Sequence, residues 1–351
     1  MKRLRRALAA ALGERLACVT LSSLRATVGP CSGETDPMSA KTCVCFVCDE
    51  GYLFPTLLAA VQARGASPTD RADVAVFMIG PATPAAGAFA DAFCRHGVRF
   101  RAFPESIIEG RPIHCARFFL DRMLNDAYRD FLYLDGDVQV HGDLTELIDL
   151  DLGGRGVAAI RDPMAYMITR TTRQWTELRD YFQSIGLAAS AMRDYFNSGI
   201  IRASRDAWLQ AASDCLRIID RSSRGFRFPD QDPLNLVLNS QYAPLATRWN
   251  FPIFLKSWRR YDAIRPRIVH FMSNPRPWQM ACRPWGEEGT QPYLDLVRSH
   301  PELACFQVRA SAARRLRYHA QQFYKSVVEG WQWDSRRVFE TIASADQTCV
   351  I

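Results

Sequence analysis

The chain has 351 residues, of which 48% are hydrophobic, with 44 lysines and arginines against 37 aspartates and glutamates. This length and composition predict a folded chain with a sizeable core and exclude a largely disordered one. The formal net charge of +7 is concentrated at the ends, because residues 1–30 carry six basic and one acidic side chain and residues 309–339 carry seven and two. The nearly neutral body between them argues against a nucleic-acid partner.

The basic start of the chain resembles a signal peptide, but its apolar stretch is short and is broken by Glu14 and Arg15. Residues 1–40 are therefore interpreted as a basic extension, either an amphipathic helix or a disordered segment. No run of 18 apolar residues occurs, which predicts no transmembrane helix. Cys43, Cys45 and Cys48 lie in an apolar run, so they are expected to pack in a core and not to bind zinc. Free cysteines in a core favour a reducing, cytoplasmic location.

Strand and helix patterns alternate through the first half of the chain. Apolar runs predict strands at 41–48, 73–79, 98–103 and 131–134, and helical spacing predicts helices at 54–64, 84–96 and 112–128. Such alternation is typical of βαβ units and a mostly parallel sheet, which binds ligands beyond the carboxyl ends of its strands.

The second half of the chain is less regular. Strands are predicted at 157–160, 195–202 and 267–271, and helices at 233–239 and from Arg205 onward, the latter capped by Ser204. Beyond Trp278 the pattern becomes helical, basic and aromatic. We predict one catalytic domain at 41–280 and a basic helical C-terminal appendage at 281–351.

Motifs of several common enzyme classes are missing from the sequence. There is no P-loop, no dinucleotide-binding glycine motif between a strand and a helix, no His-Glu-x-x-His and no Gly-x-Ser-x-Gly.

The strongest local signal is Asp135-Gly136-Asp137 directly after the apolar run 131–134. Two carboxylates two residues apart point to one side, where they repel each other unless a cation bridges them. His270 ends another apolar run and precedes Arg276. Two carboxylates and an imidazole suit Mn²⁺, or alternatively Mg²⁺, and a nearby arginine suits a diphosphate.

Two further polar motifs lie between these signals. In Asp230-Gln231-Asp232 either aspartate is a candidate cap for the helix that follows. Asn197-Ser198-Gly199 lies on a predicted strand, where a buried asparagine needs partners that a protein group or a sugar hydroxyl supplies equally well.

Taken in order, these motifs resemble those of the family 8 glycosyltransferases, especially the bacterial lipopolysaccharide and lipooligosaccharide galactosyl- and glucosyltransferases. The matching segments, spread between about Thr42 and Trp278, are Tyr133-Leu-Asp135-Gly-Asp137-Val, Tyr195-Phe-Asn197-Ser-Gly199, Asp230-Gln231-Asp232 and His270-x-x-Ser-x-x-Arg276-Pro-Trp278.

The resemblance implies an α/β nucleotide-diphospho-sugar transferase (GT-A-like) fold, with a mixed, mostly parallel sheet flanked by helices. It also implies Mn²⁺-dependent, anomer-retaining transfer of a hexose from UDP-galactose or UDP-glucose to a glycan or glycolipid acceptor in lipopolysaccharide-type biosynthesis. The metal ligands so implied are Asp135, Asp137 and His270. The implied donor-binding residues are Asp49, Tyr52, Arg117, Asp135, Gly136, Asp137, Ser273 and Arg276, and those at the reaction centre are Asn197, Asp230 and Gln231, with Asp162 near the acceptor. Because an amide is a poor nucleophile, Gln231 favours same-face attack, with Asp162 and Asp230 as alternative nucleophiles.

Two other functions remain open at this point. Ser273, Arg276 and Gly51 stand where the family usually carries Gly, Lys and Asn. The changes to Ser273 and Gly51 would suit a degenerate, non-catalytic member that binds a nucleotide sugar or a glycan. A metal-dependent nucleotidyltransferase shares the sheet and the paired carboxylates. It would usually carry a glycine-rich basic loop after the first strand, which Asp49-Glu50-Gly51-Tyr52 does not resemble.

The C-terminal charge is interleaved with aromatic residues. Basic residues at 314, 315, 317, 325, 336 and 337 alternate with Tyr318, Phe323, Tyr324, Trp331 and Trp333. This mixture fits peripheral attachment to an anionic membrane surface at its inner face, and it also fits a solvated helical pair packed on the catalytic domain.

Overall fold

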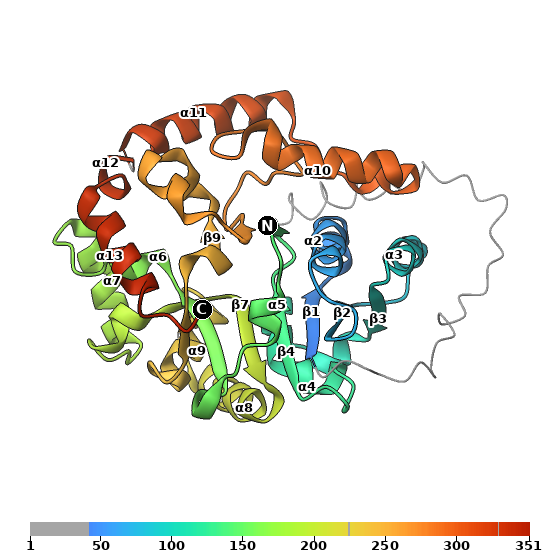
Figure 1. Cartoon of the computed structure of the whole chain (residues 1–351), viewed down its shortest axis with the longest axis horizontal. Coiled ribbons are helices and arrows are strands. Elements are labelled where there is room, and N and C mark those ends of the chain that lie inside the picture. The colour runs from blue at the N-terminus through green and yellow to red at the C-terminus, as the bar shows by residue number, and fades with distance from the viewer. Residues whose placement is uncertain (1–41, 224, 329) are drawn as a thin grey trace.

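The computed structural model describes residues 42–223, 225–328 and 330–351, so the expectations for residues 1–40 lie outside the described range. Seven strands form the central sheet: β1 (Thr42–Cys48), β2 (Ala72–Ile79), β3 (Arg99–Phe103), β4 (Asp130–Leu134), β6 (Val157–Arg161), β7 (Phe196–Ser204) and β8 (Ala243–Leu245). Their order across the sheet is β3-β2-β1-β4-β7-β6-β8 (Figure 1).

The sheet is mixed and mostly parallel, which confirms the prediction. Strand β1 pairs in parallel with β2 on one side and β4 on the other, while β7 runs antiparallel to β4 and β6. The chain passes from β1 outward through β2 and β3 and then returns to β4 on the opposite side of β1. Such a reversal marks the place where open α/β sheets bind ligands, at the carboxyl ends of β1 and β4.

A second, three-stranded sheet has the order β5-β10-β9, with β5 (Val138–Val140), β9 (Phe251–Pro252) and β10 (Ile268–His270). Strands β5 and β9 were not predicted, because two or three residues are too few for a periodic pattern. The antiparallel register pairs His270 with Val138, the residue that follows Asp137. This small sheet therefore brings two distant sequence motifs together.

Helices cover both faces of the large sheet (Figure 1). On one face a core cluster joins the sheet to α2 (Leu53–Gly65), α3 (Pro84–Arg95) and α10 (Gly286–Ser299). On the other face a cluster includes residues of α4 (Leu120–Met123), α8 (Arg205–Arg221) and α9 (Gln231–Leu238). Because β1 is shielded on both faces, its sequence is apolar throughout rather than alternating, and Cys43, Cys45 and Cys48 lie buried in it as predicted.

A third cluster builds the second half of the molecule around the small sheet. It contains residues of α6 (Pro163–Met167), α7 (Arg173–Ser184), α12 (Gly330–Trp333) and α13 (Arg336–Asp346), together with β9 and β10. The remaining helices are α5 (Thr145–Ile148) and α11 (Ala312–Val328). Within the described residues, no helix combines the length and the apolar character needed to cross a membrane.

Three expectations about helices need correction. The helix predicted over 112–128 is instead a 3₁₀ segment, Ile113–Phe119, followed by the single turn α4. Periods of 3.0 and 3.6 residues place apolar side chains similarly over one or two turns, so the sequence pattern does not separate them. Ser204 precedes α8 as predicted, but its side chain accepts no capping hydrogen bond. The helix predicted over 233–239 begins two residues earlier, at Gln231.

Candidate active site

The motifs of the sequence meet at the carboxyl ends of β1 and β4. Asp135, Gly136 and Asp137 link β4 to β5, and the backbone N–H of Asp135 donates to the carbonyl of Gly199 on β7 at 2.8 Å. The backbone N–H of Phe271, just after β10, donates to the carbonyl of Asp137 at 3.0 Å. Three segments far apart in the sequence are thereby fixed around one point.

Asp135, Asp137 and His270 form a group suited to a metal ion. One ligand atom from each residue lies within 4.8 Å of the others, and within the described range no further group of three such side chains converges in this way. Nε2 of His270 is 3.2 Å from an oxygen of Asp137 and 3.8 Å from one of Asp135. Two carboxylates and one imidazole are a donor set that fits Mn²⁺.

The electrostatics of this group also favour a bound cation. Burial and the nearby charge of Asp137 raise the pKa of Asp135, although Arg117 opposes the shift. Burial acts on Asp137 in the same direction, but His270 and Arg276 outweigh it and hold the pKa of Asp137 well below its usual range. Two neighbouring carboxylates thus differ in their ease of ionisation, and a cation between them would stabilise both charges.

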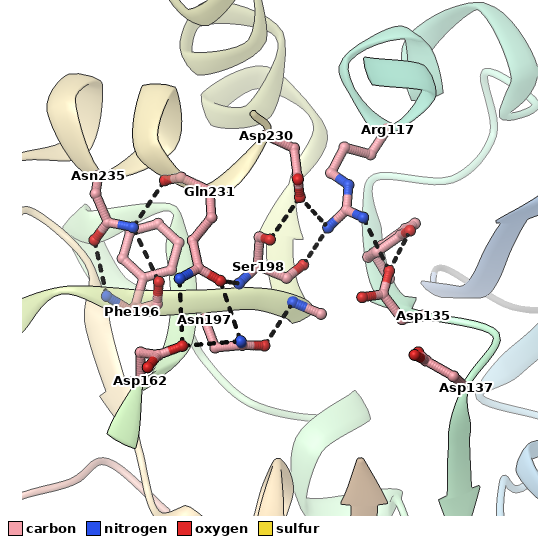
Figure 2. A network of polar contacts seen from close by, with 12 residues as sticks. Arg117, Asp135, Asp137, Asp162, Phe196, Asn197, Ser198, Asp230, Gln231 and Asn235 are labelled. Carbon is pink, nitrogen blue, oxygen red and sulfur yellow. Dashed lines mark hydrogen bonds and ion pairs between the residues drawn. The ribbon is translucent and has the colours of Figure 1, made fainter. Parts of the chain in front are cut away.

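Arg117 connects the metal group to the Asp230 motif. It comes from the 3₁₀ segment 113–119, and its buried guanidinium donates to Oδ1 of Asp135 at 2.9 Å and to the carbonyl of Ser198 at 2.6 Å, and lies 3.1 Å from Asp230 (Figure 2). The ring of Tyr133 lies against the guanidinium, and its hydroxyl donates to the same oxygen of Asp135 at 2.7 Å. Charge-assisted bonds of this kind hold the carboxylates in place.

Beside this cluster, Asp162, Asn197 and Gln231 form a buried polar network (Figure 2). Nδ2 of Asn197 donates to Asp162 and to Oε1 of Gln231, each at 3.1 Å, and Nε2 of Gln231 also reaches Asp162, at 3.3 Å. Asp162 stands at the end of β6, Asn197 on β7 and Gln231 at the start of α9. Burial raises the pKa of Asp162, an effect that its hydrogen bonds partly offset.

The loop after β1 forms the next part of the site. Asp49 is exposed and accepts a hydrogen bond from the backbone N–H of Tyr52 at 3.1 Å. The pKa of Tyr52 is raised by burial and by the charge of Asp137, which places this tyrosine in the field of the metal group. At Gly136 a Cβ would lie 2.2 Å from Oγ1 of Thr56 and 3.3 Å from the Tyr52 ring, so only glycine permits this close approach of α2.

The loop after β10 supplies the last predicted residues. Arg276 donates from Nη1 to Oδ2 of Asp137 at 2.5 Å, and its guanidinium lies 5.7 Å from the centre of the Trp278 ring. Ser273 is exposed on the same loop. Arg276 therefore reaches the metal group directly.

The Asp230-Gln231-Asp232 motif does not cap its helix as one interpretation expected. Asp230 precedes α9, but its side chain accepts no capping hydrogen bond; it accepts from the hydroxyl of Ser198 at 2.6 Å. Asp232 is fully buried and accepts hydrogen bonds from the hydroxyls of Tyr181 and Tyr195 and from the backbone of Phe228. The first two residues of the motif thus face the site, and the third faces the core.

Sequence reasoning missed Asn250. This buried residue lies between Trp249 and β9, and its side chain contacts both His270 and Asn197 at 2.9 Å. The only available signal was a single asparagine between two buried aromatic residues, Trp249 and Phe251.

Solved structures share this fold. The galactosyltransferase LgtC, solved with donor and acceptor sugar analogues, is 23% identical with a TM-score of 0.57, and the match covers 74% of this chain and 99% of that one. The bifunctional glycosyltransferase WbbM is 19% identical with a TM-score of 0.61, over 80% of this chain and 54% of that one. The GT-A-like fold predicted from the motifs is thereby confirmed.

Relatives of known activity match part of the chain. Lipopolysaccharide 1,2-glucosyltransferase of Escherichia coli K12 is 24% identical over 173 residues, which are 46% of this chain and 48% of that enzyme. Lipopolysaccharide 1,3-galactosyltransferase of Salmonella typhimurium is 24% identical over 220 residues, which are 59% and 60%. The chain therefore spans about half of the length of these relatives.

The family itself is established by a match to a family as a whole. Residues 104–282, just over half of the chain, match glycosyl transferase family 8. This segment contains Arg117, the aspartate pair, Asn197, Gln231, Asn250, His270 and Arg276. The chain thus belongs to glycosyl transferase family 8.

Proposed function

We propose that this glycosyltransferase is a Mn²⁺-dependent, anomer-retaining hexosyltransferase that moves galactose or glucose from a UDP-sugar to a glycan of the lipopolysaccharide type. The observation that carries the proposal is the convergence of Asp135, Asp137 and His270 beside two arginines and the Asp162–Asn197–Gln231 network. The names of the relatives, a lipopolysaccharide glucosyltransferase and a galactosyltransferase, support both the acceptor class and the choice of hexose.

Asp135, Asp137 and His270 would hold the metal, with Mg²⁺ as the alternative to Mn²⁺. A divalent ion bound there supplies Lewis-acid stabilisation of the leaving diphosphate. Arg276 and Arg117 lie against the same carboxylates and would add positive charge where negative charge develops on the phosphate oxygens. Asp49 and Tyr52, in the loop after β1, would hold the nucleoside, and Gly136 and Ser273 would lie beside the diphosphate of the donor.

The hydrogen bonds of the candidate nucleophiles favour same-face attack over a covalent intermediate. Oε1 of Gln231 accepts from Asn197 and from the backbone of Ser198. Asp162 accepts from the backbone of Met164 and from both amides, and Asp230 is bound by Ser198 and Arg117. The Gln231 amide is a poor nucleophile and both oxygens of Asp162 accept hydrogen bonds, so these two residues are better suited to orient the donor sugar than to attack it. Asp230, whose two contacts both involve Oδ2, is the alternative nucleophile.

The test is donor turnover with purified protein. We expect Mn²⁺-dependent hydrolysis or transfer with UDP-galactose or UDP-glucose, and its loss in Asp137→Asn, which keeps the size of the side chain. The matched control is Asp126→Asn, an aspartate whose side chain is 98% exposed on a distant loop. Proton NMR of the first product should show the anomer of the donor. Donor binding without turnover would instead indicate a non-catalytic member, and release of sugar 1-phosphate would indicate nucleotidyl transfer.

We propose further that α11 attaches this enzyme to an anionic membrane at its inner, cytoplasmic face. Leu316, Phe323, Tyr324 and Val327 are 60–75% exposed, and Trp331 just beyond is 87% exposed. Leu316, Phe323 and Val327 follow helical spacing on one side, and no described residue of α11 is buried. Exposed arginines at 314, 315 and 317 near the start of the helix complement anionic headgroups.

Two of the aromatic residues in the predicted membrane pattern face inward instead. Trp333 is only 7% exposed and lies near Trp175 and Trp258, and Tyr318 is half-buried. Helix α13 also buries Val338 and Ile342, so the part of the C-terminal region that follows α12 packs on the rest of the protein. The proposed membrane surface is therefore restricted to α11 and Trp331. The domain boundary near residue 280 remains a proposal.

Vesicle co-sedimentation tests this surface. We expect binding to vesicles that contain phosphatidylglycerol, weaker binding to phosphatidylcholine alone, and loss of binding in the double variant Phe323→Ser, Trp331→Ser. Leu209→Ser on α8 is the matched control, because Leu209 is an exposed apolar residue, at 39%, outside this surface. Equal sedimentation of the double variant and the wild type would refute the membrane role.

A further inference from the structure

One buried residue joins the two halves of the site. Asn250 precedes β9, which pairs with β10, so its side chain lies beside the ring of His270. Its amide also contacts Asn197, whose own amide reaches Asp162 and Gln231. A continuous chain of hydrogen bonds thus runs from the metal group to the network that faces the donor sugar.

Backbone N–H groups determine which atom donates and which accepts in each of these hydrogen bonds. The backbone N–H of Gly199 donates to Oδ1 of Asn197 at 3.0 Å, which makes this oxygen an acceptor and directs Nδ2 toward Asp162 and Gln231. The backbone N–H of Ser198 fixes Oε1 of Gln231 in the same way. Nδ2 of Asn250 therefore has to donate a hydrogen bond to Oδ1 of Asn197, and only Oδ1 of Asn250 is left to face His270.

This direction determines the form of the histidine. The contact between Oδ1 of Asn250 and Nδ1 of His270 is 2.9 Å, and an amide oxygen only accepts, so Nδ1 carries the proton. In the neutral ring Nε2 then carries a lone pair, and this nitrogen faces Asp137 and Asp135. A histidine that binds a metal needs this arrangement, in which an outer partner holds the second ring nitrogen.

We infer that Asn250 is a positioning residue, which directs the lone pair of His270 to the metal and at the same time sets the orientation of the Asn197 amide. The inference rests on the proposed function for the identity of the metal. The contact between Asn250 and His270 does not depend on that proposal.

Two substitutions separate the two roles. Asn250→Ala removes both contacts, and Asn250→Asp keeps an oxygen for Nδ1 of His270 but offers no N–H to Asn197. In calorimetry without donor, we expect Asn250→Ala to weaken Mn²⁺ binding by about 10–100-fold, the usual cost of losing an outer partner of a metal-bound histidine. Asn250→Asp should bind Mn²⁺ much better than Asn250→Ala, yet lose turnover of the UDP-sugar at saturating Mn²⁺.

The control is Asn235→Ala. Asn235 is an equally buried asparagine that bonds to the backbone of Phe196 and Gln231 and has no contact with His270. This variant should unfold at a lower temperature and bind Mn²⁺ as tightly as the wild type. Similar losses of Mn²⁺ affinity in both alanine variants would show that Asn250 only stabilises the fold.

A measurement without metal keeps this inference separate from the proposed function. ¹⁵N NMR of histidine-labelled protein, at a pH where the ring is neutral, should show His270 protonated at Nδ1, with the signal assigned from a His270→Gln variant. Protonation at Nε2, or a tautomer unchanged in Asn250→Ala, would overturn the inference. Wild-type protein that binds no Mn²⁺ and turns over no donor would count against the proposed function, while the NMR result would still decide the role of Asn250.

Discussion

Arg276 donates to one oxygen of the Asp137 carboxylate at 2.5 Å, while Nε2 of His270 lies 3.2 Å from the other oxygen. The same carboxylate is thus shared by a proposed metal ligand and a fixed positive charge. An arginine held in this position would be able to contact the diphosphate of the proposed donor, because its planar guanidinium offers further N–H donors.

Substitution of Arg276 tests whether its charge or its shape matters. Arg276→Gln removes the charge and should lower donor turnover by about 10²–10³-fold, the size of effect seen when one preorganised donor is lost. Arg276→Lys keeps the charge in the form that the family usually carries and should lose far less. Steady-state kinetics with the UDP-sugar compare the two variants. Equal losses of turnover would mean that the positive charge of Arg276 does not contribute to catalysis.

Gly199 is required by the packing of the metal group. A Cβ at this position would lie 2.4 Å from Cε1 of His270 and 2.8 Å from Oδ2 of Asp135. Because the strand and the histidine are both buried, we expect Gly199→Ala to displace these ligands and abolish Mn²⁺ binding measured by calorimetry. In contrast, Gly87→Ala on α3, where no atom lies within 4 Å of the added Cβ, should leave Mn²⁺ binding intact and raise stability by about 0.5–1 kcal/mol.

Elements of this fold are predictable from the sequence where they depend on neighbouring residues, and not where they depend on contacts between residues far apart in the chain. Strands β1, β2 and β4 were predicted because their burial on both faces leaves continuous apolar runs. The helix α7 is an exception, because its buried residues Trp175, Leu178 and Phe182 follow a local helical spacing and yet it was not predicted.

The candidate site follows the same rule. Asp135 and Asp137 are neighbours in the chain, so their proximity was predictable, and His270 joined them through the resemblance to a family. Asn250 acts only through contacts to residues 20 and 53 positions away. A lone asparagine carries no local pattern, so its role required the fold.

Asp232 allows a prediction that separates stability from chemistry within one motif. Its carboxylate is buried and accepts three hydrogen bonds in the core. Asp232→Asn replaces one carboxylate oxygen by an NH₂ group, which would face the hydroxyl and N–H donors that now bind the carboxylate. We therefore expect this substitution to lower the free energy of unfolding by about 1–3 kcal/mol. Urea unfolding measures this loss. Below the temperature at which the variant unfolds, its donor turnover should stay near the wild-type value, whereas Gln231→Ala should lose turnover; the reverse order would place Asp232 in the site.

The contact between His96 and His300 predicts how stability depends on pH. Arg95 donates to Nδ1 of His300 at 2.8 Å, so the proton of the neutral His300 ring lies on Nε2, which donates to Nε2 of His96 at 2.8 Å. A proton added to Nε2 of His96 would face another proton. Burial lowers the pKa of His96, and so do the charge that His300 carries when it is protonated and the charge of Arg95.

Unfolding returns His96 to an ordinary histidine pKa of about 6.5. Below that pH the unfolded chain binds more protons than the folded one, so this contribution to stability is complete above about pH 6.5 and is lost as the pH falls toward the lower folded pKa. His96→Gln keeps an acceptor for His300 but does not titrate. Urea unfolding at pH 7.5 and pH 5.5 should show a smaller loss of stability on acidification for His96→Gln than for the wild type. An equal loss in the two proteins would mean that the histidine pair does not bind protons differently in the folded and unfolded states.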